Sequence, residues 1–415
     1  MPICDIILGS LSERFIIMDS EQIYNDFITR YQAYPKQLAS VVCGMRDRGE
    51  FSENIEDENY NLGTMGKGRH SSSEIFVMNA VSFRQAFEGY KSQNAEMNET
   101  EAKARVVFDF LKQNGVEGLS YEKDKDEVVF DYDKDTRVTR AQFYATSVYE
   151  DALTNTNYFD KHVGNAQLIS LKQRDMAELS RIHADGFSEI PKEEQLEIIY
   201  KRGLYHESVH TALGTTDERK CDSFALLKVM KEHPKHAQTI FDMYNVQRSQ
   251  MGYTLGRFYG KDEEAKQESV RGGAMTYIMP NTYSKLKQYA QNPSLIPQTD
   301  EGIMKLSCEL TREPEFSKEQ LSEFSKLMGK KGVTPQDLAK NEIVQSCMRQ
   351  GGFESIDEFI ANDKRLNAYF SAVKPPQIPN RFGTQSQDVL PPQIPKSQEK
   401  GTDTLRLAQI RNQKS

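Results

Sequence analysis

The sequence predicts a mainly helical protein of the α+β class, with only a small β element. Apolar residues recur at helical spacing along most of the chain. Two stretches have the pattern of strands: residues 118–132, which we interpret as a β-hairpin, and residues 166–171, with the segment around Arg181–His183 as an alternative to the second. With 415 residues, the chain is long enough for two or three compact units with buried cores.

The composition indicates a soluble protein and argues against several classes of function. Hydrophobic residues make up 37% of the chain, and the mean hydropathy is −0.68. A net charge of −8 argues against a nucleic-acid-binding protein as a whole. No run of about 18 apolar residues suggests a membrane span, and the N-terminus lacks the features of a cleavable signal peptide. The five cysteines are odd in number and far apart, so we expect reduced thiols in a cytoplasmic protein, with a translocated effector as the alternative.

Residues 1–155 form the first predicted region, an α+β unit whose role the sequence does not indicate. Its expected elements are the hairpin already named and helices at 20–42, 74–90, 99–113 and 139–152. The hairpin consists of two short apolar runs joined by a charged Lys-Asp turn. A region of this size before the motif described next could bind a substrate or inhibit the protein itself.

The second predicted region has one long helix at its centre. The helix is expected to begin at Ser188–Pro191, because a proline and two following glutamates favour a first turn. Gly214 is expected to end it as a C-cap. Gly203 costs about 1 kcal/mol relative to alanine inside a helix. We therefore expect either that Gly203 leaves space beside a metal or that it separates two helices.

Within this helix, His206-Glu207-Ser208-Val209-His210 forms an HExxH motif. On a helix, residues four apart share a face, so the two imidazoles can reach one ion. Zn²⁺ suits this pair, and a catalytic zinc site has three protein ligands and a water molecule. Glu207 is placed to accept a proton from that water as the general base.

Glu218 is the first candidate for the third ligand, but the sequence offers another explanation for it. Thr215-x-x-Glu218 has the pattern of a capping box, in which the glutamate bonds back to the start of its own helix. However, Asp222 follows four residues later on the same helix face. A ligand together with an acid that orients a ligating histidine needs this spacing, so we favour Glu218 as a ligand.

These residues resemble the motif of the gluzincin metallopeptidases, in which an HExxH helix is completed by a glutamate from a later ExxxD helix. The run Glu218–Leu227 is similar to the version found in the ImmA/IrrE-like group. The resemblance covers only about 30 of the 415 residues. It implies a zincin-like helical catalytic domain, predicted at 156–292, with zinc bound by His206, His210 and Glu218. It also implies Glu207 as the general base and Asp222 behind the ligands.

The spacing departs from that family in one respect. Only seven residues separate His210 from Glu218, so a tight turn would have to fold the second helix back over the first. If it does not, other side chains become candidates for the third ligand: Asp217, Asp222, His183, His233 and His236. The tetrahedral oxyanion of peptide hydrolysis also needs a donor. Tyr277 is our choice, with Tyr253 and His183 as alternatives.

The sequence therefore predicts a zinc-dependent peptidase that acts on a protein or peptide. The alternative is an interaction or regulatory protein, with or without zinc, that recruits partners through its C-terminal parts. These parts are a helical region at 293–373 and a Pro/Gln-rich tail at 374–415 that we expect to be disordered. The tail carries two PPQIP copies, Pro375–Pro379 and Pro391–Pro395, which could bind a partner in tandem or act as a spacer.

Overall fold

The computed structural model describes most of the chain between residues 19 and 370, and the predicted tail at 374–415 lies outside the described residues. The described residues are 19–51, 75–97, 99–115, 119–122, 127–130, 139–141, 167–171, 173–174, 186–215, 217–249, 274, 277–330, 332–363, 366–367 and 370.

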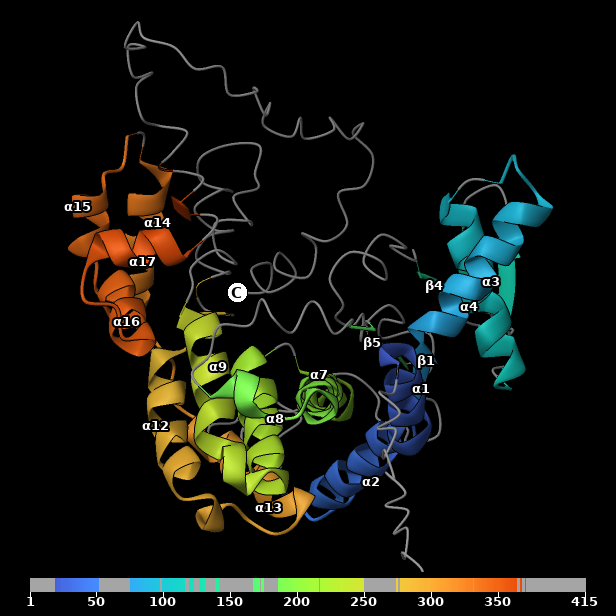
Figure 1. Cartoon of the computed structure of the whole chain (residues 1–415), viewed down its shortest axis with the longest axis horizontal. Helices are drawn as coiled ribbons and strands as arrows, with labels where there is room; N and C mark the ends of the chain where they lie inside the picture. Colours follow the sequence, from blue (N-terminus) through green and yellow to red (C-terminus); the bar gives the residue numbers. More distant parts are fainter. Residues whose placement is uncertain are drawn as a thin grey trace, which may run out of the picture. The chain divides into compact units, whose positions relative to one another are not determined.

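Helices dominate the described residues, as predicted (Figure 1). The helices before residue 155 are α1 (Ser20–Tyr31), α2 (Tyr34–Asp47), α3 (Ala80–Gln93) and α4 (Glu99–Gln113). The central helices are α7 (Lys192–Leu213), α8 (Glu218–Glu232), α9 (Ala237–Ser249), α12 (Pro280–Gln291) and α13 (Asp300–Leu310). The last helices are α14 (Lys318–Gly329), α15 (Pro335–Ala339), α16 (Glu342–Gly351) and α17 (Ile356–Asn362). Within the described ranges, three 3₁₀ turns accompany these helices: Phe187–Glu189, Pro234–His236 and Pro293–Leu295.

The described strands form two small sheets. Strands β2 (Leu119–Glu122) and β3 (Glu127–Phe130) pair antiparallel, which confirms the hairpin. Strand β4 (Thr139–Ala141) adds to β3, so the helix predicted at 139–152 is wrong at its start, and its remainder lies outside the described residues. Strands β1 (Ile75–Asn79) and β5 (Gln167–Leu171) pair in parallel, which confirms the predicted strand at 166–171.

Two of the predicted helices differ from the structure: one begins later than predicted, and the other is two helices. The prediction of helix from residue 74 is wrong, because Ile75–Asn79 is a strand and the helix begins only at Ala80. A continuous apolar run is typical of a buried parallel strand but cannot be told from a helix by periodicity alone. The helix predicted at 20–42 is two helices, and Pro35 lies in the first turn of the second, where its missing N–H costs nothing.

The helices after residue 260 agree with the prediction in part. The apolar spacing at 334–349 predicts one helix, but this stretch is divided between α15 and α16. Asn341 caps α16 by accepting from the backbone N–H groups of Ile343 and Val344. Helix α13 lies within the region 293–373 that the sequence predicts to be helical, where Thr299 caps it and two acidic residues open its first turn. The apolar spacing at 261–274 also predicts a helix, but all of this stretch except Ala274 lies outside the described residues.

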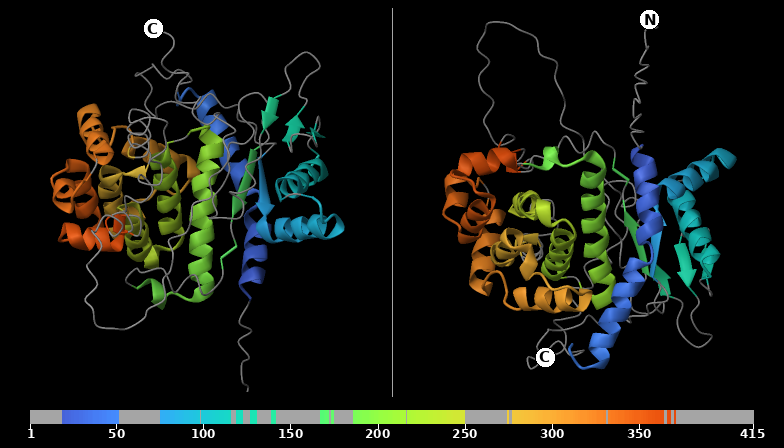
Figure 2. Two further views of the ribbon diagram at one scale, coloured as in Figure 1. Left: turned by 90° about the horizontal axis from the view of Figure 1, so that it is seen from above. Right: turned by 60° about the horizontal axis from the view of Figure 1, so that its bottom comes forward.

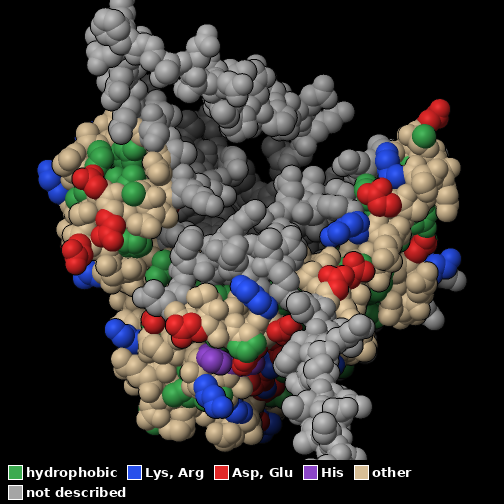
Figure 3. All heavy atoms as spheres, in the orientation of Figure 1, with side chains coloured by type: hydrophobic (Ala, Val, Ile, Leu, Met, Phe, Trp, Pro, Cys, Tyr) green, Lys and Arg blue, Asp and Glu red, His purple; other side chains and the backbone are tan. Residues whose placement is uncertain are grey.

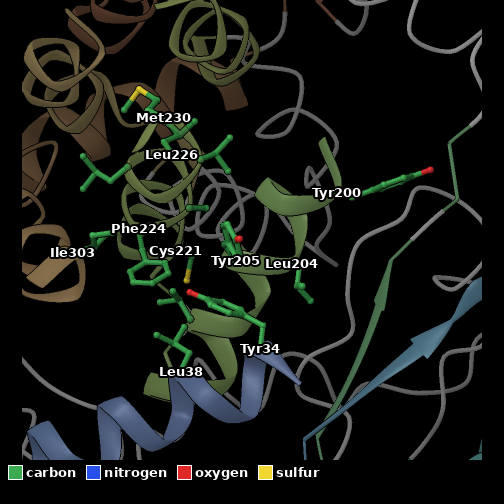
Figure 4. Packing of buried hydrophobic residues seen from close by; sticks show 14 of the residues in the cluster. Tyr34, Leu38, Tyr200, Leu204, Tyr205, Cys221, Phe224, Leu226, Met230 and Ile303 are labelled. Carbon is green, nitrogen blue, oxygen red and sulfur yellow. The ribbon is translucent and has the colours of Figure 1, made fainter. Parts of the chain in front are cut away.

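The main hydrophobic core surrounds α7. In both views of Figure 2, α7 runs between the β1–β5 pair and helices α8 and α9. Figure 4 shows how α2, α7, α8 and α13 share one core, with Leu38, Tyr205, Phe224 and Ile303 all buried in it. The core around the predicted catalytic region therefore includes residues before 155 and after 292.

A second core lies under the last helices. It is built from α14–α17 and includes Phe324, Val344 and Phe359. Helix α16 also contacts α9, because the Asn245 side-chain amide donates to the Gln350 carbonyl at 2.7 Å.

The described surface is mixed in charge. On the face that Figure 3 shows, Lys and Arg side chains are interspersed with Asp and Glu. Among the helices that the structure describes, none has both the length and the apolar character needed to cross a membrane.

Candidate metal centre

Helix α7 carries the motif, and both of its ends agree with the prediction. Pro191 precedes its first turn, which contains Glu193 and Glu194. Gly214 follows its last turn with φ 59° and ψ 29°, the left-handed conformation that glycine adopts most readily. This residue turns the chain sharply, so that α8 packs directly against α7.

Gly203 has neither of the roles that the sequence suggested. Helix α7 is continuous through this position, so there is no break into two helices. A Cβ atom on Gly203 would lie 3.4 Å from Cδ2 of Leu171 in β5. A Cβ atom would therefore just touch the strand pair, and a larger side chain would push α7 and β5 apart.

Helix α8 begins at Glu218, and Asp217 is its N-cap. The Asp217 carboxylate accepts from the Arg219 backbone N–H at 3.1 Å. Thr215 lies before the cap, and its hydroxyl oxygen accepts from the Asp217 N–H instead. The capping-box explanation of Glu218 is therefore wrong, because Glu218 is the first helical residue and not the third.

Three side chains converge as the motif predicted: His206, His210 and Glu218 offer donor atoms that lie within 4.8 Å of one another. The two Nε2 atoms are 3.2 Å apart. Glu218 Oε2 lies 3.0 Å from Nε2 of His206, and Oε1 lies 3.5 Å from Nε2 of His210. Tetrahedral ligands at about 2.0–2.1 Å from Zn²⁺ are about 3.3 Å apart. The two Nε2 atoms have this spacing, and a different oxygen of Glu218 lies at a comparable distance from each of them.

The second ring nitrogen of each histidine faces an oxygen atom. His210 Nδ1 lies 2.8 Å from the Thr215 carbonyl oxygen. With its proton on Nδ1, His210 donates to this carbonyl and keeps Nε2 for a metal. His206 Nδ1 lies 2.8 Å from Oδ1 of Asp222, which places Asp222 behind the ligand as predicted. The ring N–H does not point along this line, so the contact is a close polar contact rather than a linear hydrogen bond.

Asp222 is completely buried and is held by cations and a hydroxyl group. Arg202 and Arg248 both donate to its carboxylate, and the Tyr283 hydroxyl donates to Oδ2 at 3.1 Å. Burial alone would raise the pKa of Asp222, but the two guanidinium groups hold it well below its usual value. Asp222 is therefore an anion beside His206.

Glu218 is ionised for a related reason. Burial raises the pKa of Glu218, but His206 and His210 hold it below the usual range while their imidazoles are protonated. A metal cation at the same atoms would act in the same direction. The Arg248 Nη2 atom also lies 3.5 Å from Oε2 of Glu218. A carboxylate ligand has to be deprotonated to bind a metal, so the site keeps Glu218 in the required state.

Glu207, the predicted general base, lies next to the donor atoms. It is buried, and its Oε1 is 3.9 Å from Nε2 of His206. This places a carboxylate at the edge of the site without making it one of the three clustered donors.

The ring of Tyr277 lies beside Arg248, one of the residues that hold Asp222. The guanidinium carbon of Arg248 is 5.7 Å from the centroid of the tyrosine ring. Its predicted role as the oxyanion donor stays a prediction. The alternatives Tyr253 and His183 lie outside the described residues.

The other candidates for the third ligand have different partners. His233 and His236 both face Glu194, in the first turn of α7, where Nδ1 of His233 is 2.9 Å from Oε1. Because a helix rises by about 1.5 Å per residue, Glu194 lies roughly 18 Å along α7 from His206. Asp217 is engaged by the Arg219 guanidinium at 2.9 Å.

The sequence did not reveal the residues that surround Asp222. Arg202, Arg248 and Tyr283 are separated from it by 20, 26 and 61 residues. Only Arg202 gave a usable signal, because it precedes His206 by four residues and so shares its helix face.

A scan against models of known families and searches of curated proteins and of solved structures found no match for this chain. The resemblance to gluzincin peptidases therefore depends on the motif residues alone.

Proposed function

We propose that the chain is a zinc-dependent peptidase that hydrolyses a peptide bond in a protein or peptide substrate. The observation that carries the proposal is the convergence of His206, His210 and Glu218 from two helices, with Glu207 beside them. Two imidazoles and one carboxylate are a common ligand set of catalytic zinc, and three protein ligands leave a fourth position for water.

The residues present fit a zinc ion. Nε2 of each histidine is directed at the shared site because Nδ1 faces an oxygen, from Thr215 for His210 and from Asp222 for His206. Bound at this site, Zn²⁺ would lower the pKa of a water molecule toward 7 and polarise a substrate carbonyl. Zinc is proposed on the chemistry of the ligand set, since imidazole and carboxylate groups both suit this ion.

Glu207 would act in proton transfer. Its carboxylate accepts the proton that the attacking water loses and later donates that proton to the amine of the leaving peptide. Its position beside His206 suits this role, and its burial keeps bulk water from competing for the proton. Tyr277 is our candidate for a hydrogen bond to the developing oxyanion.

Metal analysis of the purified protein tests the ligand set. We expect one zinc per chain in the wild type and none in His206→Ala or Glu218→Ala. His236→Ala is the matched control, because this histidine faces Glu194 at the other end of α7 and should keep the zinc. Zinc retained in Glu218→Ala would remove Glu218 from the ligand set, and no zinc in the wild type would contradict the metal centre.

Glu207→Gln tests the reaction. The substitution keeps the size of the side chain and removes its ability to accept a proton, so hydrolysis of denatured casein or a peptide pool should fall by about 10²- to 10⁴-fold. Zinc content and the thermal unfolding curve should stay as in the wild type. A variant with unchanged activity would refute Glu207 as the general base. If the wild type binds zinc but cleaves nothing, the interaction-protein alternative is favoured.

A further inference from the structure

Behind the candidate ligands, two arginines from different helices meet at one aspartate. Arg202 comes from α7, Arg248 from α9, and Asp222 from α8. Asp222 is fully buried, and each arginine is 7% exposed. Two buried cations at a single carboxylate carry a large desolvation cost, so their position needs an explanation.

The contacts fix the Asp222 carboxylate on both of its oxygens. Oδ1 accepts from Arg202 and, at 2.9 Å, from Arg248 Nη2. Oδ2 accepts from Arg248 Nε at 2.6 Å and from the Tyr283 hydroxyl at 3.1 Å. With both oxygens held, the carboxylate cannot rotate freely, and Oδ1 remains 2.8 Å from Nδ1 of His206.

Arg248 makes two carboxylate contacts that Arg202 does not, and the first is its Nε bond to Oδ2 of Asp222. Its Nη2 also lies 3.5 Å from Oε2 of Glu218, a candidate ligand. Arg248 thus faces both the carboxylate that orients a ligating histidine and the carboxylate that would bind the metal itself. Together the two arginines balance the charges of Asp222 and Glu218.

We propose that Arg202, Arg248 and Tyr283 form an arginine brace around Asp222 that holds His206 and Glu218 in the ligand geometry before a metal binds. These three are positioning residues, since they act through Asp222 and Glu218. Arg248 contributes most, because its guanidinium spans both carboxylates. This inference rests on the proposed metal centre but not on peptidase activity.

The brace explains why two charged groups are buried at this point. A buried ion pair is often no more stabilising than apolar residues of similar size, so stability alone gives little reason for it. A planar guanidinium, by contrast, fixes the direction of a carboxylate through two parallel hydrogen bonds. Lysine keeps the positive charge but cannot form this bidentate contact, which makes arginine-to-lysine substitution a test of geometry.

The test compares Arg202→Lys and Arg248→Lys in the full chain. Zinc affinity is measured by competition with a chromogenic chelator, and coordination is followed by the visible spectrum of the Co²⁺-loaded protein. Loss of contacts behind the ligands typically weakens metal affinity by about 10- to 100-fold. We expect both variants to lose affinity, Arg248→Lys more strongly, and only Arg248→Lys to change the Co²⁺ spectrum markedly. Arg48→Lys, in an exposed ion pair with Glu50, is the control and should bind as the wild type.

The outcomes separate this inference from the proposed function. No zinc bound by the wild type would refute the metal centre itself. Zinc bound by the wild type, with equal affinity in Arg248→Lys, would overturn the brace. Equal losses in both arginine variants with an unchanged Co²⁺ spectrum would also overturn it, since a general loss of packing predicts that result. If Arg248→Lys does not fold, Tyr283→Phe decides: a loss of about two- to fivefold in zinc affinity supports the brace, and none refutes it.

Discussion

At the scale of single residues, Cys221 lies beside the candidate metal site but is not one of its three clustered donors. Cysteine is a common metal ligand, so its position needs an explanation. Its Sγ atom is 3.3 Å from Nδ1 of His210, the nitrogen that does not face the other donor atoms. Burial raises the pKa of this thiol to about 12, although His210 opposes the shift. The thiol is therefore neutral near pH 7 and packs in the core beside Phe224 (Figure 4).

Cys221→Ala should leave the zinc content at one per chain, because the sulfur is on the far side of His210 from the metal position. Losing one buried atom from a close-packed core should lower the free energy of unfolding by about 1–2 kcal/mol. Metal analysis and urea unfolding of the metal-free protein measure the two effects. Loss of zinc from this variant would show that the thiol is a ligand and that the tautomer assigned to His210 is wrong.

The residues of the site were predictable where they follow one another along a helix and not where they meet across the fold. The pair His206 and His210 depends only on helical spacing. The start of α8 was misread because Thr215 and Asp217 are both good N-cap residues. The choice between them depends on the turn at Gly214, which periodicity does not describe. Arg248 could not be assigned, since nothing in its neighbouring sequence marks its contact with Asp222.

At the scale of elements, α7 is unusual in being buried on nearly all sides from Gln195 to Leu213. Such a helix has no solvent face, so its polar residues need partners inside the protein. The structure supplies them: Lys201 contacts Glu197 and Glu232, each at 2.9 Å, and Arg202 contacts Asp222. The candidate ligands His206 and His210 therefore stand on a helix that is packed on nearly all sides.

Substitutions at Gly203 test how closely α7 packs against β5. Gly203→Ala should raise the free energy of unfolding by up to about 1 kcal/mol, because alanine favours the helix and its Cβ would only touch Leu171. Gly203→Leu should instead destabilise the protein by about 1–3 kcal/mol, since a larger side chain would push β5 away. Zinc binding should be unchanged in the alanine variant. Weaker zinc binding there would mean that Gly203 borders the metal after all.

Elements were predicted best where their signals are local. The hairpin of β2 and β3 and the ends of α7 follow from turn, cap and charge residues within a few positions. The pairing of β1 with β5 joins residues 75 and 167, a relation that a single sequence does not reveal. Without knowledge of that partner, the apolar run of β1 was assigned to the helix that follows it.

At the scale of the whole molecule, the candidate catalytic helices share one core with distant parts of the chain. Helices α1 and α2 pack against α7, and α13 packs against α8. Polar contacts join the same elements, since the Tyr34 hydroxyl donates to Asp300 at 3.1 Å and Lys228 bonds the same carboxylate at 2.5 Å. The boundaries predicted at 155 and 292 are thus crossed by buried contacts.

The isolated fragment 156–292 should therefore fail to fold cooperatively, although it contains every residue of the proposed metal centre. It would lose Leu38 from α2 and Ile303 from α13, among other buried side chains of the core. Each such side chain contributes roughly 1.5–3 kcal/mol on burial. Because domains are stable by only about 5–15 kcal/mol, losing a few of them cancels the stability.

Circular dichroism with thermal unfolding checks this expectation, and a fragment spanning 19–373 is the matched control. The longer fragment should unfold in a cooperative transition whose midpoint rises with zinc, because a ligand that binds only the folded state stabilises it by about 2.7 kcal/mol at one hundred times its dissociation constant. The shorter fragment should show neither the transition nor the shift. A cooperative, zinc-dependent transition in fragment 156–292 would mean that the metal centre has a sufficient core of its own, and that α1, α2 and α13 are additions to a complete domain.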